Sequence, residues 1–282
     1  MIRMRAPAFR HTSALPGFGL SFGITMAMLG IVVILPIGAL LLQGVRIGLP
    51  EIASVIGSER VRASLLLSFR IAFLAAAFNL VFGLMLAWVL ARYDFPGRRL
   101  IDAMVDLPFA LPTAVAGIAL TALYAPNGPL GAFAANFGIK VAYTPLGIWV
   151  ALVFVGLPFV VRTVQPVIDE IDREAEEASA TLGAGRVRTF VKVILPTLSP
   201  ALLTGFALAF ARGVGEYGSV IFIAGNLPMK TEIAPLLIVI RLEEFDYHGA
   251  VAIAIAMLAV SFVMLLAINL VQVLSRRRTA NA

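Results

Sequence analysis

Two ionisable residues, Arg212 and Glu216, stand four positions apart in an otherwise apolar part of the chain. On a helix this spacing places both side chains on one face, where they partly neutralise each other. Tyr217 and Ser219 follow with hydroxyl groups, and the glycines around them permit close helix packing or exposed backbone N–H groups. The pattern indicates either a polar site within an apolar helix or an ion pair that only locks this helix to its neighbours.

An acidic segment at residues 169–183 is the second stretch with distinct chemistry. It contains good helix formers, its acidic side chains crowd the first turns, where the helix dipole favours them, and Gly183 suits a helix C-terminal cap. A short amphipathic piece, Arg186–Ile194, then leads to Pro196, which suits the first turn of a further helix. The spacing predicts a helix, a glycine turn and a second helix over residues 169–194. A solvated helical loop without a partner is the alternative, since charge runs are usually solvated.

The composition shows what surrounds these residues. Of the 282 residues, 60% are hydrophobic and 13% are charged, against about 45–50% and about 25% in soluble domains. A soluble domain of this size could not cover so much apolar surface. This excludes an ordinary cytosolic enzyme and a disordered chain. The net charge of +6 arises from short basic groups between apolar runs, so membrane topology explains it better than nucleic-acid binding does. We predict an all-α polytopic membrane protein with no nucleic-acid partner.

Six apolar windows reach the roughly 20 residues that a helix needs to cross a bilayer. The predicted spans cover residues 18–42, 63–91, 100–124, 145–165, 196–224 and 250–274. They leave an N-terminal tail (1–17), a loop between the fourth and fifth spans that includes 169–194, and a C-terminal tail (275–282). Pro108 and Pro112 predict a kink in the third span, because proline removes a helical N–H donor.

The distribution of Lys and Arg predicts the orientation. Fourteen of the 22 basic residues fall on the side of the two tails and the 169–194 loop, six fall on the other side, and Arg70 and Arg212 lie within spans. Cytoplasmic loops carry the excess of Lys and Arg. Both termini and the 169–194 loop are therefore expected in the cytoplasm.

Several kinds of chemistry have no residues to support them. The chain has no cysteine and two histidines, His11 and His248, so we predict no metal site and no catalytic residues. It also has no Gly-x-x-x-x-Gly-Lys-Ser/Thr phosphate loop, so ATP, if it is used, binds another chain. Asp102 and Asp106, near the inner end of the third span, are expected to cap a helix or contact the 169–194 loop, with a substrate role left open.

The acidic segment has a recognisable spacing. Glu177-Ala178-Ser179 is followed after three residues by Gly183, and then by Val193, one residue and Leu195-Pro196. Nine residues, 184–192, separate Gly183 from Val193. This spacing resembles the EAA loop of ABC-importer permeases, in which Ala and Ile stand at the positions of Ser179 and Val193. The resemblance implies the type I ABC-importer permease fold. It also implies a coupling helix that docks on a separate ATPase through Glu177, Ala178, Ser179, Gly183, Leu195 and Pro196.

The stretch 211–226 is similar to the corresponding part of sulfate/thiosulfate importer permeases of the T type, as are residues 144–148 and 106–108. This resemblance implies an ATP-driven importer in a bacterial inner membrane. The implied partners are a W-type permease subunit, two copies of a cytoplasmic ATPase that binds ATP and Mg²⁺, and a periplasmic binding protein that delivers the anion. The chain itself is then no enzyme and needs no cofactor. Its expected pathway or gate residues are Arg212, Glu216, Tyr217 and Ser219.

Other classes remain open at this point. A molybdate or tungstate permease, usually a homodimer, would share most of these features. An ATP-independent secondary transporter or channel would act alone and gives no reason for the EAA spacing. A membrane enzyme lacks a convincing nucleophile or metal constellation. The sequence does not distinguish sulfate from thiosulfate.

Overall fold

The computed structural model describes residues 18–280, with the side chains of Arg173 and of residues 273–280 left outside the description. The expected N-terminal tail and His11 therefore lie outside the described residues. Every regular element within 18–280 is a helix, which confirms the predicted all-α class. The chain forms two units, residues 1–49 and 50–282, each described by itself.

The first unit contains one helical run built from α1 (Phe18–Leu29), the π-helical turn η1 (Gly30–Ile34) and α2 (Leu35–Ile47). The π-helical turn precedes Pro36, which has no N–H and whose ring would clash with a carbonyl one turn earlier; a wider turn relieves both problems. The same Ile-Leu-Pro sequence follows η2 (Phe190–Ile194), and the chain adopts the same π-helical turn there.

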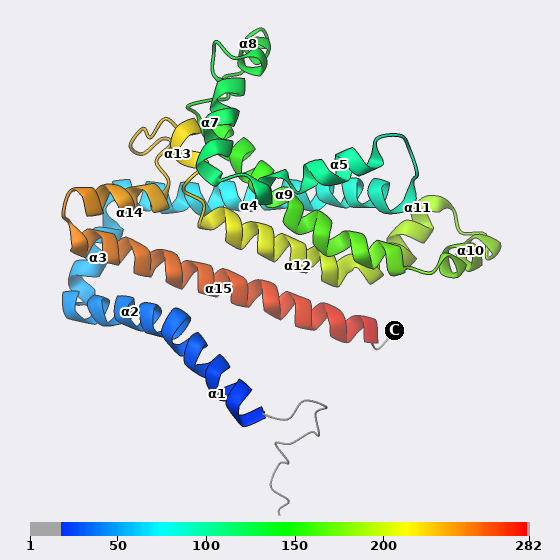
Figure 1. The fold of residues 1–282 in the computed structure, drawn as a ribbon, viewed down its shortest axis with the longest axis horizontal. Helices are drawn as coiled ribbons and strands as arrows, with labels where there is room; N and C mark the ends of the chain where they lie inside the picture. The colour runs from blue at the N-terminus through cyan, green and yellow to red at the C-terminus, as the bar shows by residue number, and fades with distance from the viewer. Residues whose placement is uncertain (1–17, 281–282) are drawn as a thin grey trace, which may run out of the picture. The chain divides into compact units, whose positions relative to one another are not determined.

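The core of the second unit consists of α4 (Glu59–Arg92), α9 (Pro145–Glu170) and α12 (Leu195–Val214), which pack against one another (Figure 1). Small residues allow the close approach that membrane helices need. At Gly156 of α9 a Cβ atom would lie 2.6 Å from Nδ2 of the buried Asn79, which instead donates a hydrogen bond of 3.1 Å to the carbonyl of Val153. Asn79 therefore joins α4 to α9.

The other elements of this unit lie around the core or at its ends. The last long helix, α15 (Tyr247–Ala280), packs on α12 and on α14 (Ala234–Glu243). Figure 1 shows α14 and α3 (Leu49–Gly57) at one end of the long helices, and α10 (Arg173–Thr181) and α11 (Arg186–Thr189) at the opposite end. A short helix, α8 (Pro129–Ala135), follows α7.

Five of the six predicted spans correspond to helical runs that are long and apolar enough to cross a membrane. The third predicted span is instead divided into α5 (Arg98–Val105), α6 (Leu107–Ala110) and α7 (Thr113–Tyr124). Pro108 is the second residue of α6, just after the first interruption, and Pro112 lies in the second; neither residue can donate to the helical ladder. The structure thus shows two breaks where we expected one kink, and the six-span count stays a prediction.

The fifth predicted span also differs from the expectation at both ends. Its helical run begins at Arg186, because α11, η2 and α12 are continuous. The piece that we expected to stand apart as Arg186–Ile194 is therefore the start of this long helix. At the other end the helix stops at Val214, and a separate turn, α13 (Val220–Ile223), follows the break.

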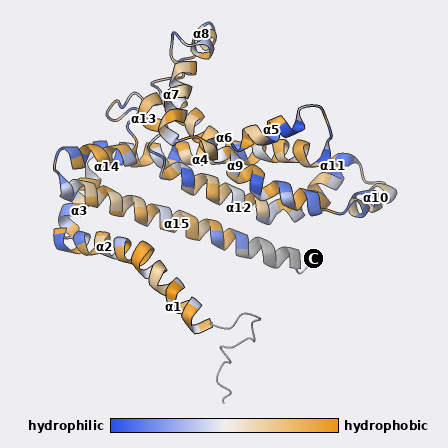
Figure 2. Cartoon of the chain, viewed as in Figure 1, coloured by the Kyte–Doolittle hydropathy of each residue, from blue (hydrophilic) through white to orange (hydrophobic). Residues whose placement is uncertain are grey.

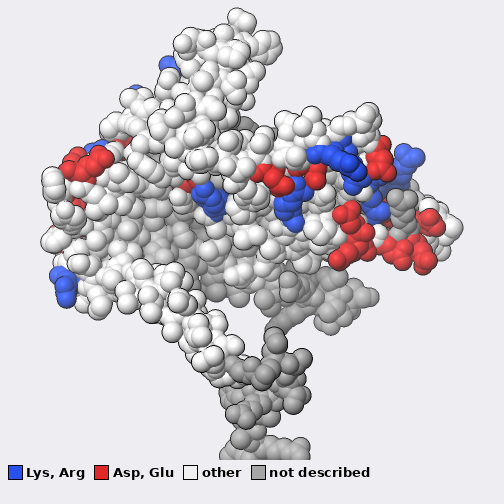
Figure 3. All heavy atoms as spheres, in the orientation of Figure 1, with Lys and Arg blue, Asp and Glu red and all other residues white. Residues whose placement is uncertain are grey.

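Polar residues gather at one end of the second unit. Figure 2 shows hydrophilic colour on α5, α10 and α11 and apolar colour along the lengths of the long helices. On the face drawn in Figure 3, acidic and basic side chains are densest over the same end. This distribution is typical of helices whose middle parts lie in hydrocarbon and whose ends reach water.

Candidate functional site

The break between α12 and α13 brings together the four predicted pathway residues. Arg212 lies in the last turn of α12 and forms an ion pair with Glu216. The other oxygen of that carboxylate, Oε1, accepts hydrogen bonds from the backbone N–H and the hydroxyl of Ser219, both at 2.9 Å. Glu216 therefore pairs with the Arg212 guanidinium before the break and accepts the backbone N–H of Ser219 after it.

These four residues differ in how far a ligand could reach them. Glu216 and Ser219 are buried, whereas the side chain of Arg212 is 34% exposed and Tyr217 is half-buried. The geometry suits Glu216 and Ser219 to holding the break in shape, and it leaves Arg212 and Tyr217 able to meet a solute. Their assignment to a pathway or gate stays a prediction.

The broken third span packs directly on this break. A Cβ atom on Gly117 of α7 would lie 2.5 Å from the carbonyl oxygen of Ser219, and one on Gly218 would lie 2.2 Å from Oγ1 of Thr113. At Gly117 the obstructing atoms belong to the main chain of Ser219, so this contact requires glycine, whereas the atom nearest to Gly218 is on the Thr113 side chain. Helix α7 of the third predicted span therefore packs main chain against main chain on the break in the fifth.

The 169–194 segment contains the helix α10, a turn at Gly183 and then α11, which continues into α12; Asp169 and Glu170, expected in this segment, are the end of α9. Asp172 caps α10 by accepting the backbone N–H of Glu174 at 3.1 Å. The chain turns at Gly183, whose φ of 81° suits glycine, and the N–H of Ala184 donates to the carbonyl of Ser179 at 3.0 Å.

The six predicted coupling residues fall into three groups. Glu177, Ala178 and Gly183 are exposed on α10 and the turn after it, beside Leu182, whose surface is 87% exposed. Ser179 instead hydrogen-bonds to Thr189 of α11 at 2.9 Å. Leu195, which is half-buried, and Pro196, which is exposed, lie in the first turn of α12.

Sequence analysis missed the partner of Asp102 and Asp106. Arg162 of α9 donates from Nε and Nη2 to the Asp106 carboxylate, each at 2.8 Å, and from Nη1 to Oδ1 of Asp102 at 2.6 Å. Arg162 lies inside α9, eight residues before the end of that helix. The two aspartates thus hold the third span to the fourth, and the expected cap or loop contact is not what they form.

Sequence analysis also missed Glu232, a carboxylate with 1% of its side chain exposed. Arg60, in the first turn of α4, donates to both of its oxygens, from Nε at 2.8 Å and from Nη2 at 2.7 Å. Two residues later the N–H of Ala234 donates to Oγ of Ser68, also on α4, at 2.8 Å. Glu232 stood outside every predicted span, so no rule for charges within spans applied to it.

Family comparisons agree with this architecture. Residues 79–281 match the family of inner membrane components of binding-protein-dependent transport systems. The chain belongs to this family, and with its apolar helices it is a multi-pass inner-membrane protein.

Two individual relatives within this family resemble the chain over most of its length. The chain is 52% identical over 258 residues to the sulfate transport system permease protein CysT of Salmonella typhimurium LT2, covering 92% of this chain and 93% of the relative. It is 48% identical over 254 residues to CysT of Synechocystis sp. PCC 6803, covering 90% of this chain and 89% of the relative.

Solved structures share the fold. A chain of a bacterial ABC transporter involved in the import of the acidic polysaccharide alginate superposes with a TM-score of 0.74 at 15% identity, over 92% of this chain and 96% of that one. A chain of the MetNI methionine ABC transporter gives a TM-score of 0.55 at 17% identity, over 75% and 94%. These likenesses confirm the predicted ABC-importer permease fold.

The buried Glu232 carboxylate gives a stability prediction. Replacing Arg60 by Met leaves a desolvated charge without its partner, so we expect a loss of roughly 1–3 kcal/mol in unfolding free energy, moderated because Arg60 is one-third exposed. Adding Glu232→Gln to Arg60→Met should recover part of the loss, because the buried group is then neutral. Thermal unfolding in detergent measures both effects. Arg62→Met, at an exposed position two residues along, is the control, and equal melting temperatures for the two single variants would contradict the prediction.

Proposed function

We propose that this chain is a transmembrane permease subunit of an ATP-driven importer of sulfate or thiosulfate. The observation that carries the proposal is the 52% identity, over nearly the whole chain, to a sulfate transport system permease. At this identity the residues that meet the substrate are expected to be shared more often than in the alginate and methionine transporters, which resemble the chain in fold alone.

The proposed complex contains a second, W-type permease subunit, two copies of a cytoplasmic ATPase and a periplasmic binding protein. ATP and Mg²⁺ bind the ATPase, and this chain contributes half of the pathway. The exposed surface of α10, with Glu177, Ala178, Gly183 and the apolar Leu182, supports a docking role for this loop. The basic residues at the end that carries α10 support a cytoplasmic location for that end. The count of Lys and Arg in the sequence supports the same side for both termini.

The proposed pathway passes Arg212 and Tyr217. A tetrahedral dianion is strongly hydrated and should be held only briefly in the membrane. A single cation tempered by a carboxylate suits brief contact, because Glu216 cancels part of the attraction of Arg212. Glu216 and Ser219 have an indirect role. Their hydrogen bonds hold the chain in shape at the break, and this shape sets the direction of the Arg212 guanidinium.

Uptake by the assembled complex in vesicles tests the proposal. We expect radiolabelled sulfate to enter only when the binding protein, the ATPase and ATP are all present, and unlabelled thiosulfate to compete better than molybdate. Preferential competition by molybdate would assign the chain to the molybdate and tungstate class. Uptake by this chain alone, without ATP, would make it a secondary transporter.

Docking of α10 gives the second prediction for this complex. Gly183→Asp introduces a side chain at a positive φ and a charge at the tip, and Glu177→Lys inverts the charge of an exposed docking residue. Each should reduce co-purification of the ATPase by tenfold or more, an effect of about 1.4 kcal/mol, while folding is retained. Glu174→Lys, an exposed change on the same helix but outside the EAA residues, is the control. Wild-type co-purification and uptake by both variants would remove these residues from the interface.

The pathway assignment predicts that Arg212→Ala transports poorly even in complexes that assemble. Because the buried Glu216 loses its cation, the yield of assembled complex should also fall, so uptake is normalised to the amount of complex. We expect the sulfate uptake rate to fall by about tenfold or more, since one fixed charge in a low-dielectric site is worth over 1 kcal/mol. Arg212→Lys should recover part of the rate, because it restores charge without the forked geometry of arginine. Unchanged uptake by a fully assembled Arg212→Ala complex would leave Arg212 with a packing role.

A further inference from the structure

The helix α10 has few connections to the rest of the second unit. Its neighbours are α11 and η2, which follow it in the chain, and its Ser179 hydroxyl contacts Thr189 of α11. Through this route a movement of α10 reaches α12 along the main chain. A second route leads to α4, which precedes α10 by 80 residues in the sequence.

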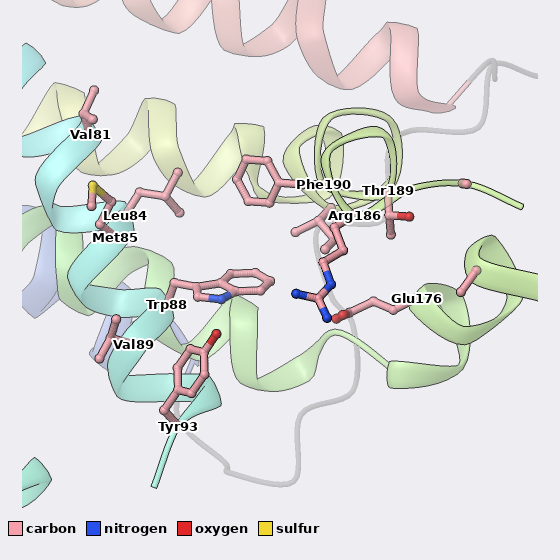
Figure 4. Close-up of a pocket in the computed structure, with 13 residues that line it drawn as sticks. Val81, Leu84, Met85, Trp88, Val89, Tyr93, Glu176, Arg186, Thr189 and Phe190 are labelled. Carbon is pink, nitrogen blue, oxygen red and sulfur yellow. The ribbon is translucent and has the colours of Figure 1, made fainter. Parts of the chain in front are cut away.

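Apolar packing does not fill the space between α4 and α10. A hollow of about 770 Å³ lies there, lined on one side by α4 residues and on the other by residues of α10, α11 and η2 (Figure 4). Figure 4 shows Trp88 and Met85 facing this space from α4, and Glu176 facing it from α10. Helix α10 thus faces α4 across the hollow, and the packed contact in this region joins α4 to η2 through Trp88 and Phe190.

One side chain bridges the two helices at the rim of the hollow. Nη2 of Arg92, the last residue of α4, donates to Oε1 of Glu176 at 2.8 Å and to the carbonyl of Ile171 at 3.4 Å. The Arg92 side chain is 13% exposed and that of Glu176 is 32% exposed. The bridge is thus shielded from water more than a surface ion pair is.

The Arg92 guanidinium is also held in direction by the helix that carries it. Its Cζ atom lies 5.4 Å from the ring centroid of Trp88, a cation–π contact one turn earlier on α4. The Trp88 ring in turn meets the ring of Phe190 in η2 edge to face, at 5.9 Å between centroids. Arg92 therefore behaves as a rigid extension of α4 that reaches α10.

We propose that Arg92 is a positioning residue that transmits the movement of α10 to α4. The inference rests on the proposed function, in which the partner ATPase moves α10. Without Arg92, the ATPase would still dock on the exposed face of α10 and still move the start of α12, but α4 would follow less, through the contact of Trp88 with Phe190 alone. The expected defect is ATP hydrolysis that is poorly converted into transport.

The first test compares Arg92→Met with wild type in the complete reconstituted transporter. Methionine keeps a flexible apolar side chain beside Trp88 and removes the charge. We expect normal co-purification of the ATPase and near-normal ATP hydrolysis, with sulfate imported per ATP lower by about fivefold, the lower end of allosteric coupling effects. Arg99→Met, an exposed arginine on α5, is the matched control. An unchanged ratio of sulfate to ATP in Arg92→Met would overturn the inference.

Replacing the Arg92–Glu176 ion pair with a covalent cross-link distinguishes a role in transmitting movement from a role in protein stability. The chain has no cysteine, so Arg92→Cys combined with Glu176→Cys provides a single pair for a short bis-maleimide linker. The double variant should be uncoupled before cross-linking and recover most of the sulfate-to-ATP ratio afterwards, while each single cysteine variant shows no recovery. If the cross-linked protein stays uncoupled, or loses transport that the uncross-linked variant had, a fixed link between α4 and α10 is not what transport needs.

These outcomes are distinct from a failure of the proposed function. If wild type shows no ATP-dependent sulfate uptake, the substrate or the importer class is wrong, and the ratio has no meaning for any variant. If wild type transports and Arg92→Met releases the ATPase, Arg92 supports docking, and the transmission role is excluded.

Discussion

Within hydrocarbon every backbone donor and every charge needs a partner inside the protein, and the breaks in this fold are built around that requirement. The fifth predicted span stops at Val214, and the Glu216 carboxylate takes both the nearby cation and the backbone N–H of Ser219. Asp106, at the first break of the third predicted span, accepts hydrogen bonds from Nε and Nη2 of Arg162. At both of these breaks an acid and a base meet, and the pair at Asp106 also joins two helices.

The same requirement divides the second unit into a stiff centre and more loosely held ends. In the centre, α4, α9 and α12 approach closely through small residues and the buried Asn79. At the end that carries α10, ion pairs replace close packing: Arg162 holds α5 to α9, and a hollow separates α4 from α10.

Local patterns in the sequence were enough to predict the class, most of the helices and the EAA loop, because composition, apolar length and fixed spacing are properties of neighbouring residues. Contacts between distant residues were not predictable in this way. Arg60 meets Glu232 across 172 positions and Arg162 meets Asp106 across 56, and no spacing rule relates them. The effect of a proline on its helix was not predictable for the same reason. Pro108 and Pro112 lie at breaks, yet α9 continues through Pro158 and Pro166, where packing on α4 and α12 holds the helix together.

The contact at Gly117 has a consequence for how this protein can change over time. The atoms that a larger side chain would strike belong to the main chain of Ser219, which every possible residue at position 219 would also possess. No exchange at the facing position could make room, and no residue smaller than glycine exists. A lineage that lost Gly117 could regain function only by shifting an entire helix, so this position offers evolution no gradual route of escape.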